Sequence, residues 1–196
     1  MNLKNLSNSL KLVSKEFKRK NKNIWDIILY GSIVRGREKL RDIDIAIILS
    51  ESKPLSYKLN LAQNFKHILP IKNLDFDVRT IDFYDILDKT FLARQGILTG
   101  GFSLLKNKFI SEYFGFKTFV IFTYNLKGLS SNEKRIFSYI LTGRRGYPGL
   151  IKKMDIKQLG RGVLRVPIQF SEEIQELLEK NNIKYKKETT IFSNFV

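Results

Sequence analysis

The chain has 196 residues and a formal net charge of +16, with 43% hydrophobic residues and no cysteine. These values exclude a disulfide framework and a zinc-finger site, and the 15 Phe and 8 Tyr argue against a disordered chain. No apolar run approaches the roughly 20 residues that span a bilayer, and the N-terminus lacks the apolar core of a signal peptide, so we expect a cytoplasmic protein without a membrane partner.

The large positive charge predicts a partner that carries phosphate groups. One nucleoside triphosphate needs far fewer cations, so we expect a nucleic acid as well, RNA in the first place. A lysine-rich solvated surface is the alternative explanation, which the charge alone does not distinguish.

In chain order, the first element expected is an amphipathic helix over residues 3–20. Apolar residues at positions 3, 6, 10, 13 and 17 recur at helical spacing, and lysines occupy the opposite face. The apolar side predicts packing against a core, and a basic ridge facing nucleic acid is the alternative.

The stretch from Trp25 to Leu49 contains the main candidate site residues of the chain. Its two short Ile-rich runs are bounded by turn-type residues and predict two buried strands. Gly31 and Ser32 follow the first run, and a short helix is expected after them. Successive residues of a strand point to opposite faces, so Asp42 and Asp44 should project together from the start of the second strand.

The pair Asp42 and Asp44 predicts a cation site. Two carboxylates side by side repel each other, and without a cation one of them would tend to stay protonated. Mg²⁺ suits such a pair because it prefers hard oxygen ligands and keeps waters and substrate phosphates in its shell. Gly31 allows close backbone approach to a ligand, and Ser32 near a helix start would offer N–H groups to phosphate. These parts together predict a site for a metal ion and a triphosphate.

The spacing of these residues resembles a known signature. Gly31-Ser32, nine residues and then Asp42-x-Asp44 is similar to the pattern of the DNA polymerase β-like nucleotidyltransferase superfamily. The segments GSIVRG and RDIDIAI are most similar to those of minimal nucleotidyltransferase domain proteins, although Val34 stands where a small residue such as Ala is usual. The resemblance covers about residues 22–108. It implies a nucleotidyltransferase with an α+β fold, a mixed sheet flanked by helices. A surface turn followed by an acidic strand edge is the alternative.

A third carboxylate is expected from residues 74–81, which predict a further strand. In the superfamily it comes from a strand beside the Asp-x-Asp strand. Asp77 matches the usual position best, and Asp75 is the second candidate. The resemblance therefore implies Asp42, Asp44 and Asp77 as catalytic residues and as ligands of Mg²⁺.

The segment after the first strand predicts the nucleotide-binding residues. Gly31, Ser32, Arg35 and Arg37 are expected to contact the phosphates of an NTP, with solvation of the two arginines as the alternative. ATP binding is the expectation, although the sequence does not identify the base.

Further elements are expected along the rest of the chain. They are helices over 57–69, 83–99, about 131–142 and 172–181, strands over 119–124, 162–166 and 184–192, a linker over 106–116 and a loop over 143–149. The expected organisation is a nucleotidyltransferase domain, residues 1–108, followed by a small basic α+β domain, residues 109–196.

Residues 142–165 predict a nucleic-acid-binding site. They hold seven Lys or Arg residues, five glycines and one acid. Gly-rich turns expose backbone N–H groups, neighbouring arginines clamp phosphate, and an aromatic ring stacks on a base. An ordinary pair of basic loops is the alternative. The candidate residues are Arg144, Arg145, Tyr147, Arg161 and Arg165.

The function expected is Mg²⁺-dependent transfer of a nucleoside monophosphate from an NTP to an acceptor hydroxyl, with release of pyrophosphate. RNA is the favoured acceptor, with tRNA as one candidate. Two alternatives stay open: a protein-nucleotidylating member of a toxin–antitoxin pair, which would have a protein partner, and a non-catalytic nucleic-acid-binding protein.

Overall fold

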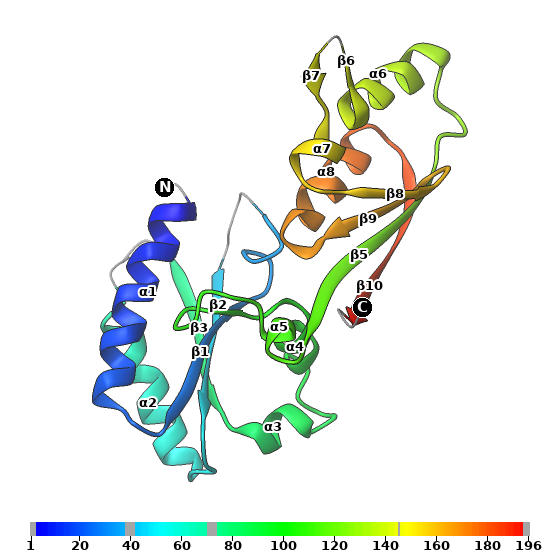
Figure 1. Cartoon of the computed structure of the whole chain (residues 1–196). Coiled ribbons are helices and arrows are strands. Elements are labelled where there is room, and N and C mark those ends of the chain that lie inside the picture. The colour runs from blue at the N-terminus through cyan, green and yellow to red at the C-terminus, as the bar shows by residue number, and fades with distance from the viewer. Residues whose placement is uncertain (1–2, 38–41, 70–73, 145, 194–196) are drawn as a thin grey trace. The chain divides into compact units, whose positions relative to one another are not determined.

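The computed structural model describes residues 3–37, 42–69, 74–144 and 146–193. Contacts along the chain divide it into two compact units (Figure 1). Unit 1 comprises residues 1–34 and 38–114, and unit 2 comprises residues 35–37 and 115–196. The predicted boundary between two domains at residue 108 stays a prediction. None of the helices in the described ranges is long and apolar enough to cross a membrane.

Unit 1 is built on a four-stranded sheet with the order β3-β2-β1-β4. β1 (Ile24–Tyr30) and β2 (Asp42–Leu49) run antiparallel, and β2 and β3 (Asp75–Ile81) run parallel. The short β4 (Phe102–Ser103) lies antiparallel to β1. The Ile-rich runs form the two central strands because both of their faces are covered by other elements. This mixed sheet confirms the predicted fold class.

Helices cover both faces of the unit 1 sheet (Figure 1). α1 (Leu3–Lys20) and α2 (Leu55–His67) pack on one face, which belongs to the largest hydrophobic cluster. α3 (Phe83–Leu87), α4 (Arg94–Gly100) and α5 (Ile110–Tyr113) contribute to a separate cluster on the opposite face. The first helix has the bounds that its apolar spacing predicts.

One long helix predicted over residues 83–99 is instead two short helices, α3 and α4. The Asp82 carboxylate caps α3 by accepting hydrogen bonds from the backbone N–H groups of Tyr84 and Asp85. The chain leaves the helix at Asp88, which has an extended backbone and whose carboxylate accepts from the backbone of Thr90. Local hydrogen bonding of Asp side chains therefore outweighs the helical periodicity.

Unit 2 contains a second four-stranded sheet, antiparallel throughout, with the order β10-β5-β9-β8. β5 (Phe116–Asn125) pairs with β10 (Lys184–Ser193) over its whole length and with β9 (Val163–Pro167) on its other side. β8 (Lys157–Gly160) forms the edge, and it is a strand that the sequence analysis does not predict. The residues of β8 are all exposed, so no apolar alternation marks them.

Three helices cover one face of the unit 2 sheet: α6 (Ser131–Thr142), α7 (Leu150–Lys153) and α8 (Ser171–Lys180), which follows the 3-10 turn η1 (Ile168–Phe170) (Figure 1). α6 begins with the predicted capping box, in which Ser130 and Glu133 each bind the backbone N–H of the other. A loop is predicted over residues 143–149, but the chain forms a hairpin there, made of β6 (Gly143–Arg144) and β7 (Tyr147–Pro148).

Candidate functional site

The carboxylates of β2 lie on one face at the start of the strand. Asp42 is exposed and Asp44 is half-buried, whereas Ile43 and Ile45 are fully buried on the other face. The alternation predicted for this strand is therefore confirmed. Further along the same face, apolar residues take over and join the cluster that α4 and α5 cover.

Gly31 brings the backbone against the Asp44 carboxylate. Its φ of +81° lies in the left-handed region, and a Cβ atom on this residue would stand 2.1 Å from Asp44 Oδ2. Tyr30, the preceding residue, is the Cα partner of Asp44 across the antiparallel pair. A residue other than glycine at position 31 would therefore meet both backbone strain and the carboxylate.

Asp77 lies beside Asp44 on the neighbouring strand. In the parallel pairing of β2 and β3, Asp44 is the Cα partner of Asp77 and Asp42 is that of Asp75. Neighbouring strands lie about 4.8 Å apart, so these aspartates are adjacent along the sheet. Asp75 is the more solvent-exposed of the two candidates, and its carboxylate lies 3.6 Å from Lys66 Nζ on α2.

Arg79 holds the Asp77 carboxylate. Its Nη2 and Nε atoms donate to Asp77 Oδ2 over 2.8 and 3.0 Å. The two residues are two positions apart on β3 and therefore share a face. This pair places a positive charge beside the carboxylate row, and the pKa of Arg79 is raised, with the hydrogen bond to Asp77 as the largest cause.

The Tyr30 hydroxyl interacts electrostatically with Asp44, Asp77 and Arg79. Burial and the negative charges of Asp44 and Asp77 together raise the pKa of this hydroxyl to about 12, against the opposing effect of Arg79. Tyr30 therefore stays protonated at neutral pH. Sequence reasoning assigned no role to Tyr30 or Arg79, although the two-residue spacing of Asp77 and Arg79 was a signal for the second.

Asp42 and Asp44 offer the hard oxygen donors that a divalent metal prefers. Within the described ranges, no group of three or more His, Cys, Asp or Glu residues lies close enough to hold a metal ion. Mg²⁺ commonly binds through one or two carboxylates together with substrate phosphates, so this pair fits it. Asp77, which is engaged by Arg79, is a candidate third ligand.

The segment that follows the Gly31 turn differs from the prediction. Residues 32–36 form turns and no helix begins at Ser32. Gly36 has a φ of +91°, and a Cβ atom on it would lie 2.4 Å from the carbonyl oxygen of Gln169 in the same unit. The left-handed backbone at Gly36 does not continue a helix. The predicted binding of phosphate by free N–H groups at a helix start therefore does not apply to Ser32.

Arg35 and Arg37 belong to unit 2. The Arg35 Nε donates to Glu172 Oε1 over 3.1 Å, and the backbone N–H of Glu172 donates to the carbonyl of Arg35. Arg37 is exposed and lowers the pKa of Glu179, for which the hydrogen bond from Tyr185 is the largest cause. Nucleotide binding by the two arginines stays a prediction.

The predicted nucleic-acid-binding residues do not gather in one place. Arg144 and Tyr147 are Cα partners in the β6–β7 hairpin, and Arg145 lies outside the described residues. Arg161 is exposed in the turn before β9. The Arg165 guanidinium lies 4.7 and 5.3 Å from the ring centroids of two phenylalanines, Phe119 and Phe192.

A family model described as Polymerase beta, Nucleotidyltransferase matches residues 13–107. The match confirms the predicted resemblance and the prediction of a nucleotidyltransferase. Among solved structures, the chain is similar to a toxin–antitoxin with AMP-PNP, at 23% identity over 48% of this chain and 71% of the other, with a TM-score of 0.36. It is also similar to the toxin–antitoxin MntA-HepT, at 21% identity over 48% and 68%, with a TM-score of 0.33. No curated protein matches the chain.

Proposed function

Because residues 13–107 form a nucleotidyltransferase domain of the polymerase β family, we propose that the protein transfers a nucleoside monophosphate from an NTP to a hydroxyl group of an RNA. The observation that carries this proposal is the row of carboxylates from Asp42, Asp44 and Asp77 beside the Gly31 turn. The choice of RNA is supported by the net charge of +16 and by the basic pockets of unit 2.

The reaction balances as a single displacement at phosphorus. The acceptor hydroxyl oxygen forms a bond to the α-phosphorus, and the bond from that phosphorus to the oxygen bridging to the β-phosphorus breaks. Pyrophosphate leaves with the bonding electrons, and the hydroxyl proton passes to solvent. Positioning and charge neutralisation are the main contributions of a protein to such a step.

Enzymes of this family generally use a divalent metal, and we propose Mg²⁺ held by Asp42 and Asp44, with Asp77 on the neighbouring strand as the candidate third carboxylate. Bound Mg²⁺ neutralises charge on the triphosphate and lowers the pKa of an attacking hydroxyl. Arg79 keeps the Asp77 carboxylate oriented through its two hydrogen bonds.

The nucleotide phosphates would lie at Gly31 and Ser32. Gly31 has no Cβ, which lets the Asp44 carboxylate lie against its backbone, and Ser32 is half-buried in the turn that follows. Tyr30 keeps its O–H as a donor, because its pKa is about 12. Arg35 is a weaker candidate for phosphate binding than these residues, since Glu172 already accepts its hydrogen bond.

A transfer assay tests the proposal. The protein is incubated with Mg²⁺ and total RNA, with each α-labelled NTP in turn, and the products are separated beside those of the Asp42→Asn variant. We expect label in an RNA band with the wild type and none with the variant. This result would identify the base and the size of the acceptor together.

Other outcomes would contradict the proposal in distinct ways. Label on protein would favour the alternative of a protein-nucleotidylating enzyme, as in a toxin–antitoxin pair. Absence of label together with metal-independent RNA binding would favour the non-catalytic alternative. Equal label with wild type and Asp42→Asn would remove Asp42 from the site.

A further inference from the structure

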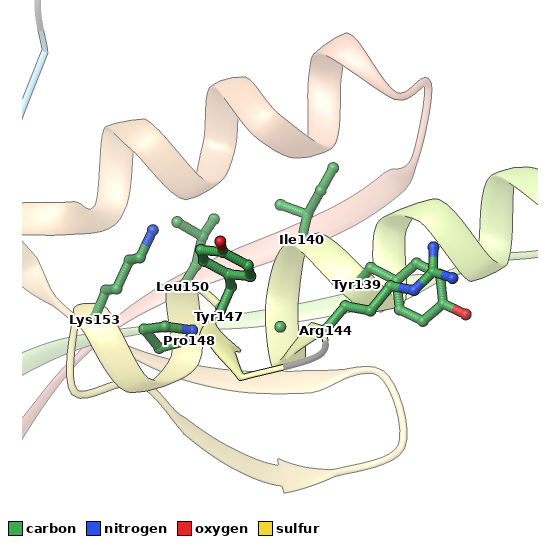
Figure 2. A pocket seen from close by; sticks show the side chains of 9 residues that line it. Tyr139, Ile140, Arg144, Tyr147, Pro148, Leu150 and Lys153 are labelled. Atoms are coloured by element: carbon green, nitrogen blue, oxygen red, sulfur yellow. The ribbon is translucent and has the colours of Figure 1, made fainter.

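The β6–β7 hairpin of unit 2 forms one side of a pocket of about 500 Å³, which we call the hairpin pocket (Figure 2). The last turn of α6 and two residues of α7, Leu150 and Lys153, complete it. The residues that line the pocket include Tyr139, Arg144, Tyr147, Leu150 and Lys153. This volume lies within the range of about 300–1,000 Å³ that is usual for small-ligand sites, and it suits one nucleotide.

Flat side chains provide the walls of the hairpin pocket. The Arg144 guanidinium lies 4.9 Å from the ring centroid of Tyr139, and Figure 2 shows the arginine side chain lying across that ring. Tyr147, the cross-strand partner of Arg144, is 81% exposed. An aromatic ring and a stacked guanidinium are the two surfaces on which nucleobases stack.

Two glycines fix the hairpin against the end of α6. A Cβ atom on Gly143 would lie 2.1 Å from the carbonyl oxygen of Tyr147, and one on Gly149 would lie 2.3 Å from that of Leu141. These contacts leave no room for a side chain at either position. The base of the hairpin therefore packs closely against the end of α6.

Cations line the hairpin pocket and two further pockets of unit 2. A neighbouring pocket of about 300 Å³ shares Arg144 and Tyr147 with it and adds Lys152, and a third pocket of about 640 Å³ adjoins at Thr142. Among the described residues that line these three pockets there is no Asp or Glu, and the cations are Lys127, Lys134, Arg144, Lys152, Lys153 and Arg161.

The positive charge that attracts an anionic ligand to these pockets comes from the lysine and arginine side chains and not from a helix end. The C-terminal end of α6 lies at Gly143, and a helix C-terminus carries partial negative charge that disfavours an anion. Six side-chain cations exceed that partial charge of about half an elementary charge. A ligand with several phosphates along a track is therefore favoured over a single free phosphate at the helix end.

We propose that the hairpin pocket binds one unpaired nucleobase of the acceptor RNA, stacked on Tyr147 and on the Arg144–Tyr139 pair. Lys152 and Lys153 hold the adjacent phosphates, and the strand continues past Thr142 towards Lys134 and Arg161. The proposal rests on the proposed function for the choice of RNA. A base inside a duplex is stacked on its neighbours and does not enter the pocket, so the ligand is single-stranded.

The test measures RNA binding without catalysis. The full chain is titrated into a fluorescein-labelled single-stranded RNA of about 12 nucleotides, in EDTA and without NTP, and anisotropy is recorded. We expect Tyr147→Ala to weaken binding about tenfold, which corresponds to about 1.4 kcal/mol. Tyr147→Phe should bind like the wild type, because it keeps the ring. The same RNA in a duplex should bind at least tenfold more weakly than the single strand.

Charge variants with a matched control sharpen the test. Loss of the two phosphate contacts in Lys152→Ala/Lys153→Ala should lower the slope of log affinity against log salt by about 1.4. The control Lys117→Ala/Lys186→Ala removes the same charge from exposed positions on β5 and β10, and we expect its slope to stay that of the wild type. Each variant's thermal unfolding is recorded to show that it is folded.

Three results would overturn the proposal. They are wild-type binding by Tyr147→Ala, an equal loss of slope in the control pair, and binding of a polyglutamate peptide as tight as that of RNA, which would point to an acidic protein instead. Failure here is distinguishable from failure of the proposed function, since the assay uses neither metal nor NTP. Asp42→Asn should bind this RNA like the wild type.

Discussion

The two units offer opposite charges to phosphate groups. In unit 1, Asp42, Asp44 and Asp77 lie near the start of two neighbouring strands, where they repel phosphate unless a cation lies between. In unit 2, the described residues around the end of α6 supply lysines and arginines without a carboxylate. From this difference we expect the proposed catalysis and the proposed RNA binding to be separable: a chelator should stop the first, and salt should weaken the second.

The largest effect is expected from Asp44→Asn. Loss of a metal ligand should reduce the transfer rate about 10³-fold, which corresponds to about 4 kcal/mol of transition-state stabilisation. The fold should tolerate the change, because it removes a like charge from a crowded site. Steady-state rates and thermal unfolding measure both.

Asp75→Asn is the matched control for that variant. Asp75 lies on the same face of β3 as Asp77 but is more exposed and lies near Lys66. We expect a rate within about threefold of wild type, since an exposed ion pair contributes little. A loss as large as that of Asp44→Asn would make Asp75 the third carboxylate.

Gly31→Ala should be the next most damaging change. The new Cβ atom would meet Asp44 Oδ2 in a left-handed backbone, so we expect the free energy of unfolding to fall by about 3 kcal/mol and the rate to fall with it. Gly128→Ala in unit 2 is the control, because Gly128 has a similar φ of +91° and a Cβ atom on it would meet nothing within 4 Å. Its cost should be about 1 kcal/mol, without a change in rate. Urea denaturation of the two variants decides the point, and equal costs would exclude the clash with Asp44.

Acid should destabilise unit 1 through Asp82. Burial opposes ionisation of this carboxyl group, but hydrogen bonds from Lys58, Ser52 and the backbone of Asp85 outweigh it and hold the pKa at about 2. The folded-state pKa is below the ordinary aspartate value of 3.8, so the stabilisation is present above about pH 4 and is lost as the pH falls to 2. We expect the loss to be about 2 kcal/mol.

Asp82→Asn isolates this contribution. The variant should be less stable at neutral pH, and its free energy of unfolding should fall less than that of the wild type between pH 4 and 2. Guanidinium denaturation at several pH values measures the difference. Parallel curves for the two proteins would show that Asp82 is not the responsible group.

The smallest effects distinguish two arginines within unit 2. The Arg165 guanidinium packs against the rings of Phe119 and Phe192, and its Nε is buried without a hydrogen-bond partner among the described residues. We expect Arg165→Ala to change RNA affinity less than twofold and to lower stability by about 1 kcal/mol. Arg161→Ala, in an exposed turn, should leave stability unchanged and lower the salt slope by about 0.7. The reverse pattern would return Arg165 to the RNA-binding surface.

Local patterns were sufficient for the elements that carry the carboxylates. The Ile-rich runs of β1 and β2 and the alternation around Asp42 and Asp44 predict strands that the structure contains. The capping box at Ser130 predicts the start of α6 for the same reason, since all of its partners lie within four residues. The parts of the fold determined by short-range contacts are those that the sequence predicts well.

Long-range contacts determine what the sequence analysis missed. The position of Arg165 beside the rings of Phe119 and Phe192 depends on the pairing of β9 and β10 with β5. The turns after Gly31 depend on the close approach of Gly36 to Gln169, over a hundred positions away along the chain. Tyr139 contributes to the hairpin pocket only because the hairpin folds back on α6. None of these relations leaves a periodic pattern in the sequence.

The most direct test of the central claim is pyrophosphate release measured together with label transfer to RNA. With the NTP identified by the transfer assay, we expect one pyrophosphate to be released for each labelled nucleotide on RNA, and none without RNA. Pyrophosphate release and label transfer should both be lost on chelation of the metal and in Asp44→Asn. Release that is undiminished in Asp44→Asn, or that proceeds equally without RNA, would contradict this claim.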